Sequence, residues 1–265
     1  MSINTNIQWT DATWNVARGC TKVSEGCKYC YMMRDSFNGT RYQPEVVEQT
    51  KTVFDFPLKY KEKQSKVWGG RPLIFTSSLT DFFHPAIDNF RNEAWDIIRK
   101  CPHLIFQILT KRADRIMPFL PLDIKSLNNV WIGISTENQQ RYDERMHYLK
   151  QVKTFYPNIK TFLSCEPLLE PIEMDIFYPN SKYKSLIDWV IVGGESGNDK
   201  GQYRYRECNE NWIRDIVDQC RAAKVPVFVK QMGTHLAKKN NLSDRHGSEF
   251  VEFPIYAQFR QFPNP

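Results

Sequence analysis

The sequence lacks any apolar run close to the roughly 20 residues that cross a bilayer, so we expect no membrane partner. The first residues, MSINTNIQWTDATW, lack the basic stretch and apolar stretch that together mark a secretory signal. These two absences predict a cytoplasmic protein. No segment has the composition of a linker, and we therefore predict a single domain over residues 1–265.

A disulfide framework is also not expected, because the number of cysteines is odd, at 7, and the predicted compartment is reducing. Three of them lie close together in GCTKVSEGCKYCY (19–31), as Cys20, Cys27 and Cys30 with the spacing C-x6-C-x2-C. Three thiolates are too few to close a zinc tetrahedron. They suit a [4Fe–4S] cluster in which one iron has no protein ligand.

Charge and composition leave room for a nucleic-acid partner without requiring one. The net charge is +6, and hydrophobic residues make up 41% of the chain, enough for a sizeable core. Basic residues gather in KYKEKQSKVWGGR (59–71). This segment is either a solvated helix end with its loop or a patch that contacts phosphates.

Short runs rich in β-branched and aromatic residues alternate with amphipathic helical patterns at 86–100, 140–150 and 211–220. A further helical stretch is expected around 44–62, and a C-terminal extension, 232–265, is expected to pack across one end of a barrel. The apolar character of the runs is nearly continuous, which is typical of parallel strands covered on both faces. The runs are PLIFTSS (72–78), LIFQILT (104–110), VWIGIST (130–136), TFLSCE (161–166), DWVIVGGE (188–195) and VPVFVKQ (225–231), and one more strand is expected near Thr13–Val16.

This alternation predicts an α/β fold, either a doubly wound sheet or a barrel. No glycine-rich phosphate loop follows the first strand, as a dinucleotide-binding unit would require. We therefore predict a (β/α) barrel, partial, with six to seven parallel strands.

Polar groups follow each predicted strand, at the end where parallel barrels carry their active sites. We expect a candidate site there, although the cations could simply pair with the carboxylates as a solvated rim. The groups in question are Ser78 and Asp81; Lys111 and Arg112; Ser135, Glu137 and Asn138; Glu166; Glu195; and Lys230.

A three-cysteine loop that ends in C-x-aromatic-C after the first strand of a (β/α) barrel resembles the radical S-adenosylmethionine enzymes. Over nearly the whole chain, WTDATWNVARGCTKVSEGCKYCY, FTSSLTDFFH, QILTKR, WIGISTEN, FLSCEPLL and DWVIVGGESG resemble the three-cysteine phage-protein family, which is linked to that superfamily. The resemblance implies a [4Fe–4S] cluster whose open iron chelates S-adenosylmethionine. It also implies an external electron donor, such as flavodoxin or ferredoxin.

The resemblance assigns roles residue by residue. Cys20, Cys27 and Cys30 would bind the cluster, and Tyr29 would contact the adenine of S-adenosylmethionine. Ser78 and Asp81 correspond to the region that binds the methionine amino group, and Ser135, Glu137 and Asn138 to the region that binds the ribose. The remaining groups would serve the substrate, with Glu166, Glu195 and Lys111 as catalytic residues and Arg112 and Lys230 as substrate contacts.

Two features depart from the superfamily. Its common spacing is C-x3-C-x2-C, whereas six residues separate Cys20 from Cys27 here, with Gly19 and Gly26 supplying backbone freedom. The GGE sequence that ends at Glu195 resembles the amino-binding motif, but it follows the sixth strand instead of the second.

Three functions remain open at this point. The first is a radical S-adenosylmethionine enzyme acting on a nucleic-acid base, a modified thymidine or a nucleotide, with DNA or RNA as partner. The second is a nucleic-acid-binding protein in which His84 completes a Cys3His zinc site. The third keeps the cluster as a structural or redox element without S-adenosylmethionine.

Overall fold

The computed structural model describes residues 5–33, 36–37, 40–41, 43–175 and 185–264. The chain divides into two compact units. Unit 1 comprises Met1–Val23, Met32–Gly133 and Tyr148–Lys160, and unit 2 comprises Ser24–Tyr31, Ile134–His147 and Thr161–Pro265. The cysteine loop therefore contributes Cys20 to unit 1 and both Cys27 and Cys30 to unit 2. The single domain over 1–265 stays a prediction.

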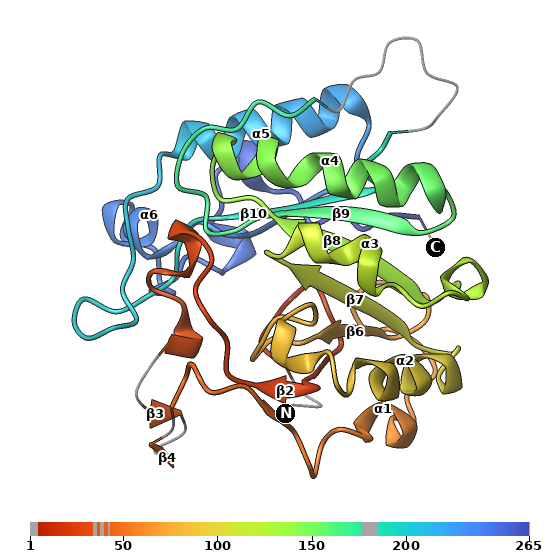
Figure 1. Ribbon diagram of the computed structural model, residues 1–265. Helices are drawn as coiled ribbons and strands as arrows, with labels where there is room; N and C mark the ends of the chain where they lie inside the picture. The colour runs from red at the N-terminus through yellow and green to blue at the C-terminus, as the bar shows by residue number, and fades with distance from the viewer. Residues whose placement is uncertain (1–4, 34–35, 38–39, 42, 176–184, 265) are drawn as a thin grey trace. The chain divides into compact units, whose positions relative to one another are not determined.

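Seven strands form a parallel sheet in the order β1-β6-β7-β8-β9-β10-β11, within a mixed α/β fold (Figure 1). This confirms the predicted fold class and the number of strands, and the order has two ends, as an incomplete barrel does. Its resemblance to the radical S-adenosylmethionine fold stays a prediction. The strands are β1 (Ala12–Trp14), β6 (Leu73–Thr76), β7 (Ile105–Thr110), β8 (Val130–Ser135), β9 (Lys160–Cys165), β10 (Trp189–Gly193) and β11 (Val227–Gln231).

Helices lie between several pairs of successive strands, at the three places where the sequence predicts amphipathic helices and at others. The longer ones are α2 (Arg91–Lys100) between β6 and β7, α4 (Gln139–Phe155) between β8 and β9, and α5 (Glu210–Ala223) between β10 and β11. The short helices are α1 (Phe56–Lys59), α3 (Ile116–Phe119) and α6 (Thr234–Lys239). Single 3-10 turns are η1 (Glu25–Cys27), η2 (Tyr31–Met33), η3 (Pro85–Ile87), η4 (Ala113–Arg115), η5 (Ile124–Ser126), η6 (Phe250–Glu252) and η7 (Ile255–Ala257). None of these helices has the length and apolar character needed to cross a membrane.

The prediction of a helix around 44–62 is wrong for most of that segment. Only α1 is helical there, and β5 (Glu48–Gln49) instead pairs antiparallel with β2 (Ala17–Arg18). The Thr50 side chain donates a hydrogen bond of 2.6 Å to the carbonyl of Asn15, which holds the segment extended. The segment is also rich in β-branched residues, which favour strands. The remaining strands, β3 (Ser36–Phe37) and β4 (Thr40–Arg41), form a separate antiparallel pair.

Each unit has its own aromatic core. In unit 1, the Trp14 ring lies 5.5 Å from that of Phe106, and its Nε1 donates to the carbonyl of Phe54 at 2.9 Å. In unit 2, the Trp189 ring stacks on that of Phe262 at 5.4 Å. The apolar face of α5 covers β10 and β11 in the same unit. Strands that are buried in this way are rigid, so they fix the positions of the polar side chains that follow their carboxyl ends.

The C-terminal extension protects the edge of β11 in unit 2. Arg260 forms an antiparallel bridge with Phe228, and the N–H of Val229 donates to the carbonyl of Phe259 at 2.7 Å. An unpaired strand edge would otherwise invite pairing with another chain. Part of the extension thus runs beside the last strand, while α6 follows directly from the carboxyl end of that strand.

Candidate functional site

Asp81, which follows β6 in unit 1, organises the turn after β7. Its Oδ1 accepts hydrogen bonds from the hydroxyl of Thr110 at 2.7 Å and from the N–H of Phe83 at 2.9 Å. Its Oδ2 accepts from the N–H of Lys111 at 3.0 Å and from Nη1 of Arg112 at 3.4 Å. The carboxylate is buried, so these four donors replace its lost hydration.

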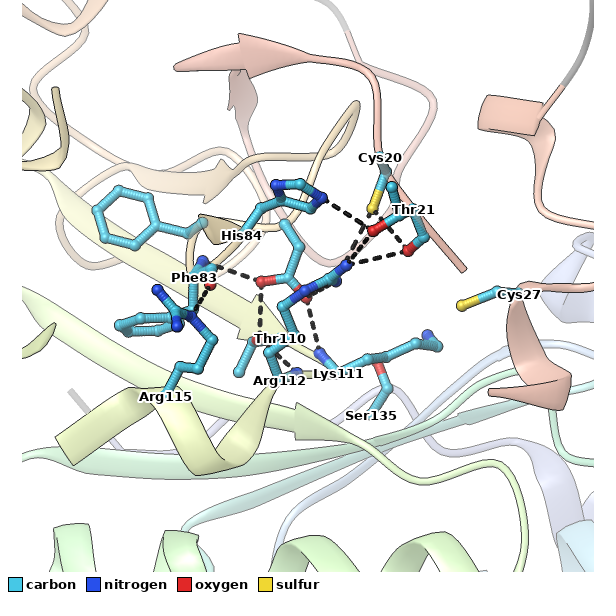
Figure 2. Close-up of polar contacts among 12 residues, drawn as sticks. Cys20, Thr21, Cys27, Phe83, His84, Thr110, Lys111, Arg112, Arg115 and Ser135 are labelled. Atoms are coloured by element: carbon cyan, nitrogen blue, oxygen red, sulfur yellow. Dashed lines mark hydrogen bonds and ion pairs between the residues drawn. The ribbon is translucent and has the colours of Figure 1, made fainter. Parts of the chain in front are cut away.

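Arg112 uses its guanidinium to hold the backbone next to Cys20 (Figure 2). Its Nη2 donates to the carbonyl of Thr21 at 3.0 Å and to the Thr21 hydroxyl at 2.8 Å. Its Nη1 lies 4.0 Å from Sγ of Cys20, and the side chain is buried. Arg112 therefore fixes the first cysteine in unit 1. Arg112 is also predicted to contact the substrate, and it would have to do so while it makes these hydrogen bonds.

His84 is engaged through both ring nitrogens (Figure 2). Nδ1 accepts from the N–H of Ala86 at 3.1 Å, and Nε2 lies 2.9 Å from the Thr21 hydroxyl. Burial, together with the charge of Arg112, holds the pKa of His84 below its usual value of 6.5. The hydrogen bonds thus assign a neutral ring with its proton on Nε2, donating to Thr21. A zinc ion could bind this histidine only by displacing one of these partners.

The turn that carries Ser78 also supports the start of the cysteine loop. The Oγ of Ser78 lies 3.1 Å from Nδ2 of Asn15, and the N–H of Leu79 donates to Oδ1 of Asn15 at 2.7 Å. The carbonyl of Leu79 in turn accepts from the N–H of Gly19 at 3.1 Å. Gly19 has φ of +98°, and a Cβ there would lie 2.1 Å from the carbonyl oxygen of Val46. Only glycine fits at this position without strain.

Glu137, in unit 2, is 0% exposed and holds the second half of the cysteine loop. One oxygen accepts from Nη1 of Arg145 at 2.7 Å. The other accepts from the Ser24 hydroxyl and from the N–H of Gly26 at 3.3 Å. A Cβ on Gly26 would lie 2.9 Å from Glu137 Cδ, so the close approach requires glycine. Arg145 also donates to the carbonyl of Ser135 at 2.7 Å, which links the end of β8 to this network.

Glu25 is held by two residues that follow β8. Asn138 Nδ2 donates to its Oε1 at 2.8 Å, and Arg141 Nε donates to its Oε2 at 3.0 Å. Burial alone would raise the pKa of Glu25, but a backbone hydrogen bond and the bonds from Asn138 and Arg141 outweigh it, so the pKa lies below its usual 4.5. Asn138, predicted to contact a ribose, therefore also anchors the cysteine loop.

Glu195, the last residue of the GGE sequence, pairs with Arg206. Its Oε2 accepts from Nε of Arg206 and from the N–H of Arg206, both at 2.8 Å. Arg206 Nη1 then donates to the carbonyl of Glu25 at 2.9 Å, and its guanidinium lies 5.3 Å from the centre of the Tyr29 ring. The GGE sequence is thereby connected to the cysteine loop within unit 2.

Glu166 and Lys230 form an ion pair that crosses β10. The Nζ of Lys230 lies 3.0 Å from Oε1 of Glu166, and the two side chains are 28% and 14% exposed. Gly193 makes room for the pair, because a Cβ there would lie 2.9 Å from the same Oε1. This pair comes from the ends of β9 and β11 and remains partly open to solvent.

Lys111 differs from its neighbour Arg112 in unit 1. Its N–H is bound by Asp81, but its ammonium group has no hydrogen-bond or ion-pair partner in the described part of the chain. The side chain is half-buried. A half-buried cation without an anion is suited to bind one from outside the protein.

The thiols fall into two classes, and none of the seven cysteines is in a disulfide. Cys101, Cys165, Cys208 and Cys220 are buried, and burial raises the pKa of each, to about 12 for Cys165 and Cys208. Such thiols stay protonated and make poor ligands. Of the loop cysteines, Cys20 and Cys30 are partly exposed, whereas Cys27 is buried, at 8% exposed. The donor chemistry of the loop therefore fits thiolate ligation, although no three ligand side chains are grouped around one point in the described residues.

The structure brings most predicted residues into contact with the loop or with one another. Sequence reasoning missed the arginines that hold the loop in unit 2, namely Arg141, Arg145 and Arg206. Arg141 and Arg145 lie four residues apart and share one face of α4, a spacing that could have flagged them. Arg206 lies in a loop 11 residues after Glu195 and carries no such signal.

Comparison with known proteins places the chain in one family. No curated protein and no solved structure matches it. The family described as "Protein of unknown function (DUF5131)" matches residues 4–257. Since that match covers nearly the whole chain, the protein belongs to the DUF5131 family of proteins of unknown function.

Proposed function

We propose that this protein is a radical S-adenosylmethionine enzyme in which Cys20, Cys27 and Cys30 hold a [4Fe–4S] cluster. One observation carries the proposal: three of the seven cysteines lie on one short loop, and buried charged residues fix the backbone of that loop on both sides of its spacer. Three thiolates leave one iron for an exogenous ligand. The resemblance to the phage-protein family agrees with this assignment.

When bound, the cluster would supply the electron that cleaves S-adenosylmethionine into methionine and a 5′-deoxyadenosyl radical. The chain's own residues would bind and orient the cofactor. Tyr29 offers its ring to the adenine, and Arg206 sets the position of that ring. Glu137 and Asn138 act on the cofactor through the loop they anchor, since their oxygens and amide are already bound there.

The substrate we propose is a nucleic-acid base or nucleotide, including a modified thymidine. One group is suited to an anionic substrate, the ammonium of Lys111 in unit 1, which has no partner among the described residues, whereas Lys230 in unit 2 would have to release Glu166, 3.0 Å away, to bind an anion. Ammonium groups bind phosphates as compact point charges. The proposed partners are therefore DNA, RNA or a nucleotide, together with an electron donor of the flavodoxin or ferredoxin type.

The basic segment 59–71 gives this substrate little further support. Lys59 pairs with Asp55 at 2.7 Å, and Lys66 lies 3.8 Å from Glu62. The guanidinium of Arg71 is bound to the carbonyls of Pro102 and Asn128 at 2.8 and 2.7 Å. These contacts are those of a solvated helix end and loop.

The alternative is a nucleic-acid-binding protein stabilised by zinc or by an iron–sulfur cluster. In the zinc form, His84 would be the fourth ligand. Ligation would cost the hydrogen bonds to Ala86 or to Thr21, which together hold the ring in one tautomer. The contacts of His84 therefore favour the cluster over the zinc site.

The deciding experiment is anaerobic purification from iron-replete cells, with iron, sulfide and zinc counted per chain. We expect one four-iron cluster, lost in Cys20→Ala, Cys27→Ala and Cys30→Ala but kept in the control Cys220→Ala. Reduced with dithionite, the protein should convert S-adenosylmethionine to 5′-deoxyadenosine and methionine. Stoichiometric zinc without iron would falsify the proposal in favour of the zinc site. A cluster without 5′-deoxyadenosine would leave the structural or redox role.

A further inference from the structure

Gly194, directly before Glu195, and Gly233 bring two backbone segments of unit 2 into direct contact. A Cβ on Gly194 would lie 2.3 Å from the carbonyl oxygen of Met232, and a Cβ on Gly233 would lie 2.7 Å from Gly194. The N–H of Thr234 then donates to the carbonyl of Glu195 at 2.9 Å. The backbone of Glu195 is thus fixed between the end of β10 and the start of α6.

This fixed carboxylate orients Arg206, and Arg206 has three different contacts. Nε and the backbone N–H bind the Glu195 carboxylate, Nη1 binds the carbonyl of Glu25, and the guanidinium lies over the Tyr29 ring at 5.3 Å. Glu25 and Tyr29 flank Cys27 in the sequence. The planar guanidinium of an arginine can contact the carboxylate, the carbonyl and the ring at once, whereas the single ammonium of a lysine cannot.

We infer that Arg206 is the positioning residue for the segment 25–30 and that Glu195 acts through it. The inference rests on the proposed function, because it matters for chemistry only if Cys27 and Cys30 are ligands. The inference also assigns a role to the GGE sequence, whose function was open because it follows the sixth strand instead of the second. Arg206 fixes the turn that presents these two thiols and holds the aromatic ring between them.

Amide hydrogen exchange on the full chain tests the positioning without depending on iron. The N–H groups of Cys27, Lys28 and Cys30 donate to the carbonyls of Ser24, Glu25 and Cys27 at 3.0, 3.0 and 3.3 Å, so they report opening of this turn. Arg206→Ala removes a hydrogen bond to a charged group together with a ring contact, and we expect exchange at least about tenfold faster. Arg206→Lys keeps the charge and should recover less than half of the protection.

Arg221→Ala is the matched control. Arg221 also pairs with a carboxylate, Asp218 at 3.4 Å, and its guanidinium also lies over a ring, that of Phe259 at 5.6 Å, but it has no contact with the cysteine loop among the described residues. Exchange in 25–30 should be unchanged there. Exchange in 188–193 should be unchanged in all variants, which shows that the fold is intact. Equal protection of 25–30 in wild type, Arg206→Ala and Arg206→Lys would overturn the inference.

A second readout separates this inference from the proposed function. In iron-loaded protein, loss of iron to a chelator should be about tenfold faster in Arg206→Ala, following the faster opening. The electron paramagnetic resonance spectrum of the reduced protein should also change, because it senses the geometry of the ligands. If wild type binds no iron, the proposed function fails while the exchange result still decides the role of Arg206. If iron binds but neither chelation nor spectrum changes, Arg206 does not position the ligands.

Discussion

Replacing Glu137 with alanine should destabilise the fold and release the cysteine loop, and the two effects can be separated. Glu137 is 0% exposed and its carboxylate is bound by Arg145 at 2.7 Å and by the loop through Gly26 at 3.3 Å. In Glu137→Ala, the buried guanidinium of Arg145 keeps, among the described residues, only its hydrogen bond to the carbonyl of Ser135 at 2.7 Å. The variant therefore leaves one buried charge without its counter-charge.

The magnitude follows from that uncompensated charge. Breaking a buried ion pair from one side costs about 3–5 kcal/mol, whereas removing both charges is often close to neutral. A whole domain is stable by only about 5–15 kcal/mol, so the single variant should lose a large share of its stability. The double variant Glu137→Ala with Arg145→Met should recover most of that loss. It cannot restore the acceptor that Ser24 and Gly26 require, so the loop should stay loose.

Denaturant unfolding measures the first effect and hydrogen exchange in 24–28 measures the second. The matched control is Asp123→Ala, which breaks an exposed pair with Arg99 at 2.6 Å and should cost at most about 1 kcal/mol. A loss below about 1 kcal/mol in Glu137→Ala would refute the reasoning about the buried pair. Full protection of the loop in the double variant would refute its anchoring by Glu137.

Two further predictions concern unit 1. Gly19→Ala should destabilise by roughly 1–3 kcal/mol more than Gly69→Ala in thermal unfolding, because both have positive φ but only Gly19 would place its Cβ against backbone. Burial would raise the pKa of Asp88, but hydrogen bonds from Arg115 and Arg91 outweigh it and hold the pKa below 3.8. A carboxylate with a depressed pKa stabilises the fold at pH values above its unfolded-state pKa, and this contribution is lost as the pH falls through its folded-state pKa. Asp88→Asn should therefore be less stable than wild type at neutral pH, and its stability should depend less on pH in the acid range. Parallel acid curves for the two proteins would contradict this.

The strands were predictable because they are covered on both faces. The run 104–110 contains β7 (Ile105–Thr110), and 130–136 contains β8 (Val130–Ser135), since each is apolar almost throughout. The segment 44–62 was not predictable from periodicity, because its pairing with β2 depends on residues far away in the sequence. Local pattern cannot report a tertiary partner of this kind.

The location of the candidate site was predictable, but the partner of each charge was not. Parallel strands bring their carboxyl ends to one edge, so the sequence could group Asp81, Lys111 and Arg112. Which side-chain cation is bound depends on the path of the backbone after β7. There the Thr110 hydroxyl accepts the N–H of Arg112 at 2.9 Å, and the guanidinium is directed to Thr21, while the ammonium of Lys111 has no partner within the described ranges. Adjacent residues of the same charge thus have opposite roles.

The long spacer between Cys20 and Cys27 is where the anchoring contacts concentrate. Thr21 is bound by Arg112 in unit 1, and Ser24, Glu25 and Gly26 are bound by residues of unit 2. Doubling the length of a flexible loop adds only about 0.6 kcal/mol to the entropy of closing it. A single hydrogen bond to a charged group contributes about 1.5–3 kcal/mol, so any one of these anchors outweighs the cost of the added residues. The three residues added relative to a C-x3-C spacing therefore cost less free energy in loop closure than the anchors contribute. The extra residues are the ones through which the protein holds its loop.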